Sequence, residues 1–166
     1  TTKRMVVYHY KTKEALYMLV LEHVYRGIRQ HELELDLSSF PPAEAIVKLV
    51  EASFDFHVSH PEFIRIVSTE NMLRGRFIRQ STSIREINKT ALTLLEDILE
   101  RGKKSHLFKE DAQARDVHRL ISSLCVHQVA NQYTFGALFE NPDEVDLQTA
   151  HYRQLAVMVA LRYVMK

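Results

Sequence analysis

Basic side chains gathered near the N-terminus are the first residues in the sequence whose types suggest a chemistry. Lys3, Arg4, Lys11 and Lys13 lie within the first 13 residues, and no acidic residue lies among them. In the rest of the chain, 18 basic residues face 21 acidic ones, which gives that part a net charge of −3. A basic run is often only a solvated face, but amines beside hydroxyl and aromatic side chains also suit phosphate groups. The segment therefore predicts contact with a negatively charged partner.

A second group of chemically capable side chains follows Pro61. Glu70, Asn71 and Arg74 place three strong hydrogen-bonding groups close together in a segment that is otherwise apolar. An unpaired carboxylate or guanidinium is costly inside a core. These groups therefore lie either on the solvent face, where Glu70 and Arg74 can pair four residues apart, or along a cavity.

Patterns for catalysis or metal binding are weak. The stretch HELEL begins like a zinc-protease motif but has leucine where the second histidine would stand. No glutamate is followed three residues later by a histidine, which argues against a di-iron bundle. His57, His60 and Glu70 are a weak alternative for a metal site. Cys125 lies in an apolar run and is interpreted as a core residue. We therefore expect no catalytic residue, no metal and no cofactor.

The elements that must position these groups are predicted to be helices, which gives an all-α fold. Only four glycines and four prolines occur in 166 residues, and the intervals between them lack the alternation of strands. A hydrophobic content of 46% at this length suits one or two packed units. No run of 18 apolar residues is present, and the single cysteine cannot form an internal disulfide. We expect no membrane contact and a cytoplasmic location.

Capping residues and prolines predict where the helices begin and end. A short helix covers 2–8, and a second begins after Thr12, whose hydroxyl suits an N-cap. Pro41 and Pro42 separate the second from the third, because proline disfavours helix in the residue before it. Gly102 is predicted to close a long helix as a C-cap. The remaining predicted spans are 42–59, 62–73, 83–101, 111–139 and 146–165.

The last two predicted helices carry apolar residues on more than one face. The final one contains LAVMVALRYVM, residues 155–165, which is apolar nearly all round. A helix of this kind must bury more than one face. The second covering surface is most simply another copy of the chain, with Leu155, Val159 and Arg162 near the two-fold axis. A central core helix is the alternative.

The N-terminal stretch TTKRMVVYHYKTKEAL resembles the end of the DNA-binding domain in the tetracycline-repressor (TetR) family. Members of that family commonly read S-K-G-T-L-Y-Y-H-F-K-S-K-E-E-L-L there. Thr2 stands where the family has the capping serine, and Tyr8, His9 and Tyr10 occupy the Tyr-His-Phe positions. Beyond this stretch the resemblance is one of architecture, in the helix lengths, the short helix after Pro61 and the long final pair.

The resemblance implies a division of the chain and a function. Residues 1–11 are the end of a helix-turn-helix domain with its recognition helix, and residues 12–166 are a connecting helix with a ligand-binding and dimerising domain. The first two helices of the helix-turn-helix are expected to be lacking from this chain. The implied protein is a homodimeric regulator, a repressor released from its operator DNA by a small-molecule effector. A helical adaptor that never touches DNA and a small helical enzyme are the alternatives.

The resemblance also implies roles for individual residues. DNA contacts are expected from Thr2, Lys3, Arg4, Tyr8, His9, Lys11 and Lys13, whereas Tyr10 is expected to pack between helices. In the family, the helix that corresponds to the one after Pro61 often borders the effector cavity, which favours a cavity there. Its wall is expected to include Phe54, His57, Glu70, Asn71, Arg74, Asn88, Leu92, Cys125 and Val129. Such a wall suits a small, partly polar, aromatic or acidic effector.

Overall fold

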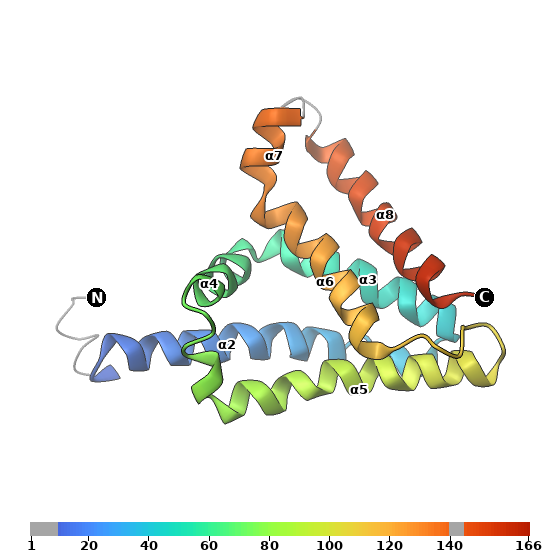
Figure 1. Cartoon of the computed structure of the whole chain (residues 1–166), viewed down its shortest axis with the longest axis horizontal. Helices are drawn as coiled ribbons and strands as arrows, with labels where there is room; N and C mark the ends of the chain where they lie inside the picture. The colour runs from blue at the N-terminus through green and yellow to red at the C-terminus, as the bar shows by residue number, and fades with distance from the viewer. Residues whose placement is uncertain (1–9, 140–144) are drawn as a thin grey trace.

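The computed structural model describes the backbone of residues 10–139 and 145–166 and the side chains of residues 10–139 and 149–166 (Figure 1). Within these ranges every regular element is a helix, which confirms the predicted all-α class. The predicted helix over residues 2–8 lies outside the described residues. The α-helices are α2 Lys13–Leu33, α3 Pro42–Ser59, α4 Pro61–Met72, α5 Thr82–Lys104, α6 Ala114–Ala130, α7 Gln132–Phe139 and α8 Val145–Val164. Two short 3-10 helices, η1 Leu37–Ser39 and η2 Ile78–Gln80, lie between them.

Local chemistry starts the helices close to where the sequence predicts. The hydroxyl groups of Thr12 and Ser81 each accept a hydrogen bond from the backbone N–H three residues later, at 3.0 and 3.1 Å. Pro42 and Pro61 stand in the first turns of α3 and α4, where a missing N–H is not needed. These starts set which side chains of α2 to α5 face inward.

Gly102 does not end α5, so its predicted role as a C-cap is wrong. The helix continues to Lys104, and a Cβ placed on Gly102 would lie 2.0 Å from Cδ2 of Phe108. The glycine instead lets the fully buried ring of Phe108 pack directly against α5. Phe108 also pairs with Met165 in an isolated β-bridge, which ties the segment after α5 to the C-terminal end.

The single helix predicted over residues 111–139 is also wrong, because α6 and α7 are separate. The backbone of Gln113 is extended, so α6 begins only at Ala114. The break falls at Asn131, whose backbone has φ −106° and ψ 3°. Asparagine competes with the helical backbone through its own side chain and therefore favours helix ends.

The helices enclose one large apolar core and one smaller cluster. Figure 1 shows α2 and α5 side by side, and α6 leading to α7, after which α8 returns along α3 and α6. The apolar core lies where α3, α5, α6 and α8 meet, around Phe54, Leu95, Phe108 and Val117. The smaller apolar cluster joins α2, α3 and α4 to the end of α6 through Ile28, Phe56, Phe63, Ile64 and Val129. None of the described helices is long and apolar enough to cross a membrane.

Candidate functional site

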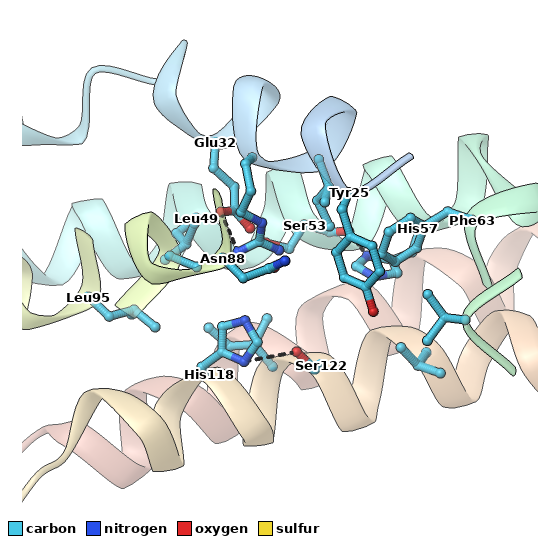
Figure 2. Close-up of a pocket in the computed structure, with 16 residues that line it drawn as sticks. Tyr25, Glu32, Leu49, Ser53, His57, Phe63, Asn88, Leu95, His118 and Ser122 are labelled. Atoms are coloured by element: carbon cyan, nitrogen blue, oxygen red, sulfur yellow. Dashed lines mark hydrogen bonds and ion pairs between the residues drawn. The ribbon is translucent and has the colours of Figure 1, made fainter. Parts of the chain in front are cut away.

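A cavity of about 160 Å³ lies among α2, α3, α4, α5 and α6 (Figure 2). Its polar lining consists of Tyr25, Arg29, Glu32, Ser53, His57, Asn88, His118 and Ser122. Its apolar lining consists of Ile28, Leu49, Phe63, Val67, Ala91, Leu95, Ile121 and Val126. Positions three or four apart share one face of a helix, so each helix contributes at least two of these side chains. In Figure 2, Glu32 and Tyr25 project from one side of the cavity, and His118 and Ser122 lie on the opposite side.

Arg29 and Glu32 form an ion pair in the cavity wall. Nη1 of Arg29 lies 2.8 Å from Oε2 of Glu32, and the two side chains are only 7% and 8% exposed. The contact lacks the alignment of a hydrogen bond, so Nη1 has no hydrogen-bond acceptor among the described residues. Nε of Arg29 has none either. Burial raises the pKa of Glu32 to about 7, although the charge of Arg29 opposes this rise. The cavity thus holds a guanidinium whose hydrogen-bonding capacity is only partly used.

Two histidines add further polar groups to the wall. Nδ1 of His57 contacts the carbonyl oxygen of Ser53, and Nδ1 of His118 lies 3.4 Å from the hydroxyl of Ser122. Burial lowers the pKa of both imidazoles, and the nearby charge of Arg29 lowers them further, although the hydrogen bond to Ser53 partly opposes this for His57. Both rings are therefore neutral at neutral pH, where each can donate one hydrogen bond and accept another.

Aromatic rings form the end of the cavity near α4. Tyr25 and Phe63 meet edge to face with ring centroids 5.5 Å apart, and His57 meets Phe63 in the same way at 5.5 Å. Rings held in this geometry favour an aromatic guest, because ring pairs gain from offset or edge-to-face contact. The cavity therefore combines a charged end at Arg29 with an aromatic end at Phe63.

An open depression between α4, α5 and α6 adjoins the cavity, and we call it the cavity mouth. It shares Val67, Asn88, His118, Ser122 and Val126 with the cavity and adds Asn71, Leu92, Arg115, Arg119 and Ser123. Arg115 and Arg119 are exposed and lie one turn apart on α6. Because no acidic side chain lines the mouth, the described entrance to the cavity is positively charged.

Four of the nine predicted effector-binding residues lie at the cavity or its mouth. His57 and Asn88 line the cavity, and Asn71 and Leu92 line the mouth. The side-chain amide of Asn88 donates a hydrogen bond of 2.8 Å to the carbonyl of Ile84, which fixes its orientation. The structure therefore gathers the predicted residues of α5 with His57 of α3 and Asn71 of α4.

The remaining predicted effector-binding residues lie elsewhere. Phe54 and Cys125 belong to the apolar core, and Val129 belongs to the smaller apolar cluster. Burial raises the pKa of the Cys125 thiol to about 12, as suits a core residue. Arg74 is exposed and follows α4 with a left-handed φ of 56°. Phe54, Cys125 and Val129 lie on helices that line the cavity but point to other faces, and Arg74 lies beyond the end of α4.

Glu70 has a role that neither sequence alternative includes. Its side chain is 1% exposed, and Oε2 accepts hydrogen bonds from the backbone N–H groups of Phe77 at 2.9 Å and Ile78 at 2.6 Å. Glu70 therefore holds the turn between α4 and α5 instead of facing solvent or the cavity. In the described part of the chain, no three His, Cys, Asp or Glu side chains gather as a metal site.

Sequence reasoning missed the residues that α2 contributes to the cavity. The charged run RQHELEL indicates a fraying helix end, whereas α2 continues to Leu33 and buries Arg29 and Glu32. The signal that could have identified them is spacing. Tyr25, Arg29 and Glu32 recur at steps of three or four residues beside the core residue Ile28, which places them on the inward face.

The predicted DNA-binding residues lie mostly outside the described range. Thr2, Lys3, Arg4, Tyr8 and His9 are not among the described residues, whereas Lys11 and Lys13 are exposed next to the start of α2. Tyr10, expected between helices, is 39% exposed. Both described lysines are thus accessible to a partner at this end of the chain.

The predicted dimer residues lie on α8, beside the face that packs on the core. Leu155 and Val159 are partly buried and Arg162 is exposed, while Ala156 and Ala160 are buried. Large apolar side chains are also exposed on α7 and α8, namely Tyr133, Leu138, Phe139 and Met158. The two helices therefore present an apolar surface next to the predicted two-fold axis.

Comparison with protein families gives one match that covers most of the chain. Residues 42–159 match the family model described as "Tetracyclin repressor-like, C-terminal domain". The chain is 35% identical over 134 residues to the HTH-type transcriptional repressor NicS of Pseudomonas putida, which covers 81% of this chain and 63% of that protein. It is also 35% identical over 68 residues to the uncharacterized HTH-type transcriptional regulator YerO of Bacillus subtilis, covering 39% and 23%. The chain thus spans less than two thirds of the length of these relatives.

Solved structures share the fold at low sequence identity. A regulatory protein of the tetR family from Rhodococcus RHA1 has a TM-score of 0.72 and 19% identity, covering 99% of this chain and 80% of that one. The ketosteroid transcriptional regulator KstR2 of Mycobacterium tuberculosis has a TM-score of 0.72 and 18% identity, covering 99% and 79%. At such identity the likeness is one of helix arrangement alone.

Proposed function

Because the chain belongs to the tetracycline-repressor-like family, we propose that it forms the effector-binding and dimerising part of a DNA-binding transcriptional repressor. The name of the Pseudomonas putida relative, a transcriptional repressor of the HTH type, supports this function. In the proposal, residues 1–11 end the DNA-binding domain and residues 12–166 bind the effector in a cytoplasmic homodimer. Operator contacts come from the basic and hydroxyl-bearing residues of the N-terminal segment, including Lys11 and Lys13.

One observation carries the proposal that the cavity is the effector site. The single helix α2 begins at the exposed Lys13 and also supplies Tyr25, Arg29 and Glu32 to the cavity wall. A ligand that binds better to one position of α2 shifts the protein toward that position, by no more than its difference in affinity. Occupying the cavity would therefore move the DNA-reading end and change the spacing of the two recognition helices in the dimer.

Contacts along α2 support its role as the transmitting element. The hydroxyl of Ser81, at the start of α5, donates a hydrogen bond of 2.6 Å to Oε1 of Glu22. Tyr17 packs edge to face on Phe77 at 4.9 Å, in the turn that Glu70 holds. The N-terminal half of α2 is thus tied to the ends of α4 and α5, which border the cavity and its mouth.

A cavity-filling substitution tests the effector site. Ala91 is 3% exposed and lines the cavity, so Ala91→Leu should occupy part of its volume. In the full-length protein, we expect Ala91→Leu to bind operator DNA normally but to need much more effector for release, as measured by fluorescence anisotropy. Thr93→Leu, at an exposed position of the same helix, is the control. Release from Ala91→Leu at the wild-type effector concentration would place the effector site elsewhere.

A lysine substitution tests the DNA contact. If Lys13 binds a phosphate, Lys13→Ala should weaken binding to all sequences equally and lower the salt slope of the full-length protein by about 1. Lys104→Ala, at the C-terminal end of α5, is the control and should leave the salt slope unchanged. An unchanged slope for Lys13→Ala would remove this contact, and failure of the full-length protein to bind DNA would favour the adaptor alternative.

Assembly is tested on α8. Val159→Asp would place a charge in the proposed interface of the four-helix bundle formed by α6 and α8 with their symmetry mates. We expect light scattering to show a dimer for the wild-type chain and a monomer for Val159→Asp, with Thr93→Asp on α5 remaining dimeric. A folded wild-type monomer at micromolar concentration would overturn the dimer.

A further inference from the structure

We propose that the cavity binds a small organic carboxylate with a single ring, whose carboxylate pairs with Arg29 in place of Glu32. The inference rests on the proposed function only where it calls this ligand the effector. The ligand class itself follows from the guanidinium, the size of the cavity and the charge of its mouth.

The guanidinium of Arg29 is the anchor for the ligand. The residue is 6% exposed and lines the cavity, and both Nε and Nη1 lack an acceptor among the described residues. Buried donors without acceptors are costly, so such groups are normally paired. A carboxylate presents two oxygens in the fork geometry that a guanidinium recognises best. A neutral amide or alcohol offers at most one comparable acceptor and no charge.

The volume and the walls of the cavity determine the size and the chemical character of the ligand beyond its carboxylate. At about 160 Å³, the cavity is close to the roughly 150 Å³ cavity that is known to hold one benzene ring. Tyr25, Phe63 and His57 supply ring faces and edges at the end away from Glu32. One ring therefore fits within the cavity, whereas a fused ring system or a long acyl chain would have to extend into the cavity mouth. Asn88 and Ser122 can bind a polar substituent on that ring.

Glu32 acts as an internal stand-in for the ligand. Its carboxylate contacts Arg29 from the position three residues along the same helix, without the alignment of a hydrogen bond. A ligand carboxylate with better alignment can take over the guanidinium. Glu32 then remains buried without its cation, which favours its protonated form. Binding should therefore be accompanied by the uptake of a proton from solvent onto Glu32.

The other titratable groups that face this pair are Tyr25, His57 and His118. On α2, the pKa of Tyr25 is raised mainly by burial. On α3 and α6, burial lowers the pKa of His57 and His118, so these rings take up protons only toward acidic pH. The linings contributed by α4 and α5 contain no titratable side chain. Proton uptake at pH 8 would thus report Glu32, and uptake that grows toward pH 6 would report the histidines.

The cavity mouth favours entry of an anion. Arg115 and Arg119 are exposed at the entrance, and no acidic side chain lines it. A concave entrance with charge of one sign raises the local concentration and the association rate of ligands of opposite sign, in a manner that salt reduces. The positive mouth and the buried guanidinium lie on the same route, so both act on the same ligand charge.

Calorimetry with a small set of probes tests the ligand class. Benzoate and the three hydroxybenzoate isomers would be titrated into the wild-type chain, each beside its neutral amide. We expect at least one carboxylate to bind, and its amide to bind roughly ten- to a hundredfold more weakly, because the charge-assisted hydrogen bonds are lost. Binding of none of the four carboxylates, or equal binding of the matched amides, would overturn the proposal.

Substitutions of the two partners of the ion pair should have opposite effects. Arg29→Gln should abolish carboxylate binding, whereas Glu32→Gln should strengthen it at pH 8, because the internal competitor is neutral. Titration in two buffers of different ionisation enthalpy should show uptake of up to one proton by the wild type at pH 8 and none by Glu32→Gln. Arg26→Gln, at an exposed position one turn earlier, is the matched control. If both cavity substitutions weaken binding alike, the pair is only structural and the proposal fails.

A double variant is the control for misfolding of Arg29→Gln. If Arg29→Gln unfolds, the double variant Arg29→Gln with Glu32→Gln replaces the buried ion pair by a neutral pair. This double variant should fold but should not bind the carboxylate.

Carboxylates that bind through Arg29 but leave the operator affinity of the full-length protein unchanged would support the ligand class and contradict the effector role. Release of DNA by neutral compounds alone would support the effector role of the cavity and contradict the carboxylate ligand class.

Discussion

The apolar core and the cavity bury different kinds of side chain within a few helical turns of each other. The core around Phe54, Phe108 and Val117 is built from apolar side chains. In contrast, buried polar residues gather at the cavity and at the neighbouring ends of α4 and α5, namely Arg29, Glu32, Ser53, His57, Glu70 and Ser81. Both regions use α3, α5 and α6, so the difference lies in which face of each helix is involved.

This difference separates the source of stability from the source of recognition. Close apolar packing stabilises the fold, whereas a buried charge contributes little or costs free energy unless its partners are well aligned. Substitutions in the core should therefore change the free energy of unfolding most. Substitutions in the cavity should act mainly on ligand binding and on pH dependence.

The largest effect on stability is expected at the contact between Gly102 and Phe108. Alanine normally stabilises a helix relative to glycine by about 0.5–1 kcal/mol. At Gly102 the added Cβ would lie 2.0–2.5 Å from three atoms of a fully buried ring, so Gly102→Ala should instead destabilise the protein by about 3 kcal/mol. Gly27→Ala is the matched control, because its nearest contact is 4.0 Å away at Phe56 Cζ. Urea unfolding that shows both variants equally stable would contradict the tight packing of Phe108.

The second effect is the pH dependence that Glu32 confers on stability. Its pKa is raised by burial from 4.5 to about 7, so the folded protein binds a proton that the unfolded chain has released between these values. The contribution of Glu32 to the free energy of unfolding therefore falls as pH rises from about 4.5 to 7, by up to about 3 kcal/mol. Glu32→Gln removes this dependence, so the difference between wild type and variant isolates it from the opposing histidines. A difference that stays constant across this pH range would show that Glu32 titrates normally.

The third effect is local and concerns Glu70. Glu70→Ala leaves the backbone N–H groups of Phe77 and Ile78 without their acceptor, which should cost about 1–3 kcal/mol. Hydrogen exchange of these two amides should accelerate more than that of the apolar core. Asn71→Ala, at the exposed neighbouring position, is the control. Uniform acceleration throughout the protein would indicate that Glu70 supports the whole fold instead of one turn.

The sequence predicts those features that depend on local chemistry. Thr12, Pro42 and Pro61 act within one turn of themselves, so the starts of α2, α3 and α4 could be predicted to within a residue. The family could also be recognised, because the residues that carry its motif are contiguous.

The features that the sequence did not predict depend on contacts between distant segments. Gly102 has the type of a C-cap, and only the ring of Phe108 against it shows that it is a packing site. Glu70 finds its partners seven and eight residues away in the next turn. Arg29 and Glu32 are polar residues of α2 that line a cavity enclosed by four other helices, so their burial depends on segments distant in the sequence. Of the sixteen residues that line the cavity, the sequence predicted only His57 and Asn88 as effector-binding residues.

The smallest effect is expected at the surface ion pairs of Arg153, which contrast with Arg29. Nε and Nη2 of Arg153 donate to the two oxygens of Asp55 at 2.8 Å, and Nη1 donates to Glu51 at 2.7 Å, linking α8 to α3. Every partner is aligned, yet the side chain is 32% exposed, so water can replace these bonds. Arg153→Gln should therefore lower the free energy of unfolding by less than about 1 kcal/mol, and less still at high salt. It should leave benzoate binding unchanged, because each of the three nitrogens of Arg153 already donates a hydrogen bond outside the cavity. Thermal unfolding at two salt concentrations, with calorimetry alongside, measures both. A loss of carboxylate binding in Arg153→Gln would show that an arginine whose nitrogens already have acceptors also contributes to ligand binding. Arg153 and Arg29 would then not differ in role.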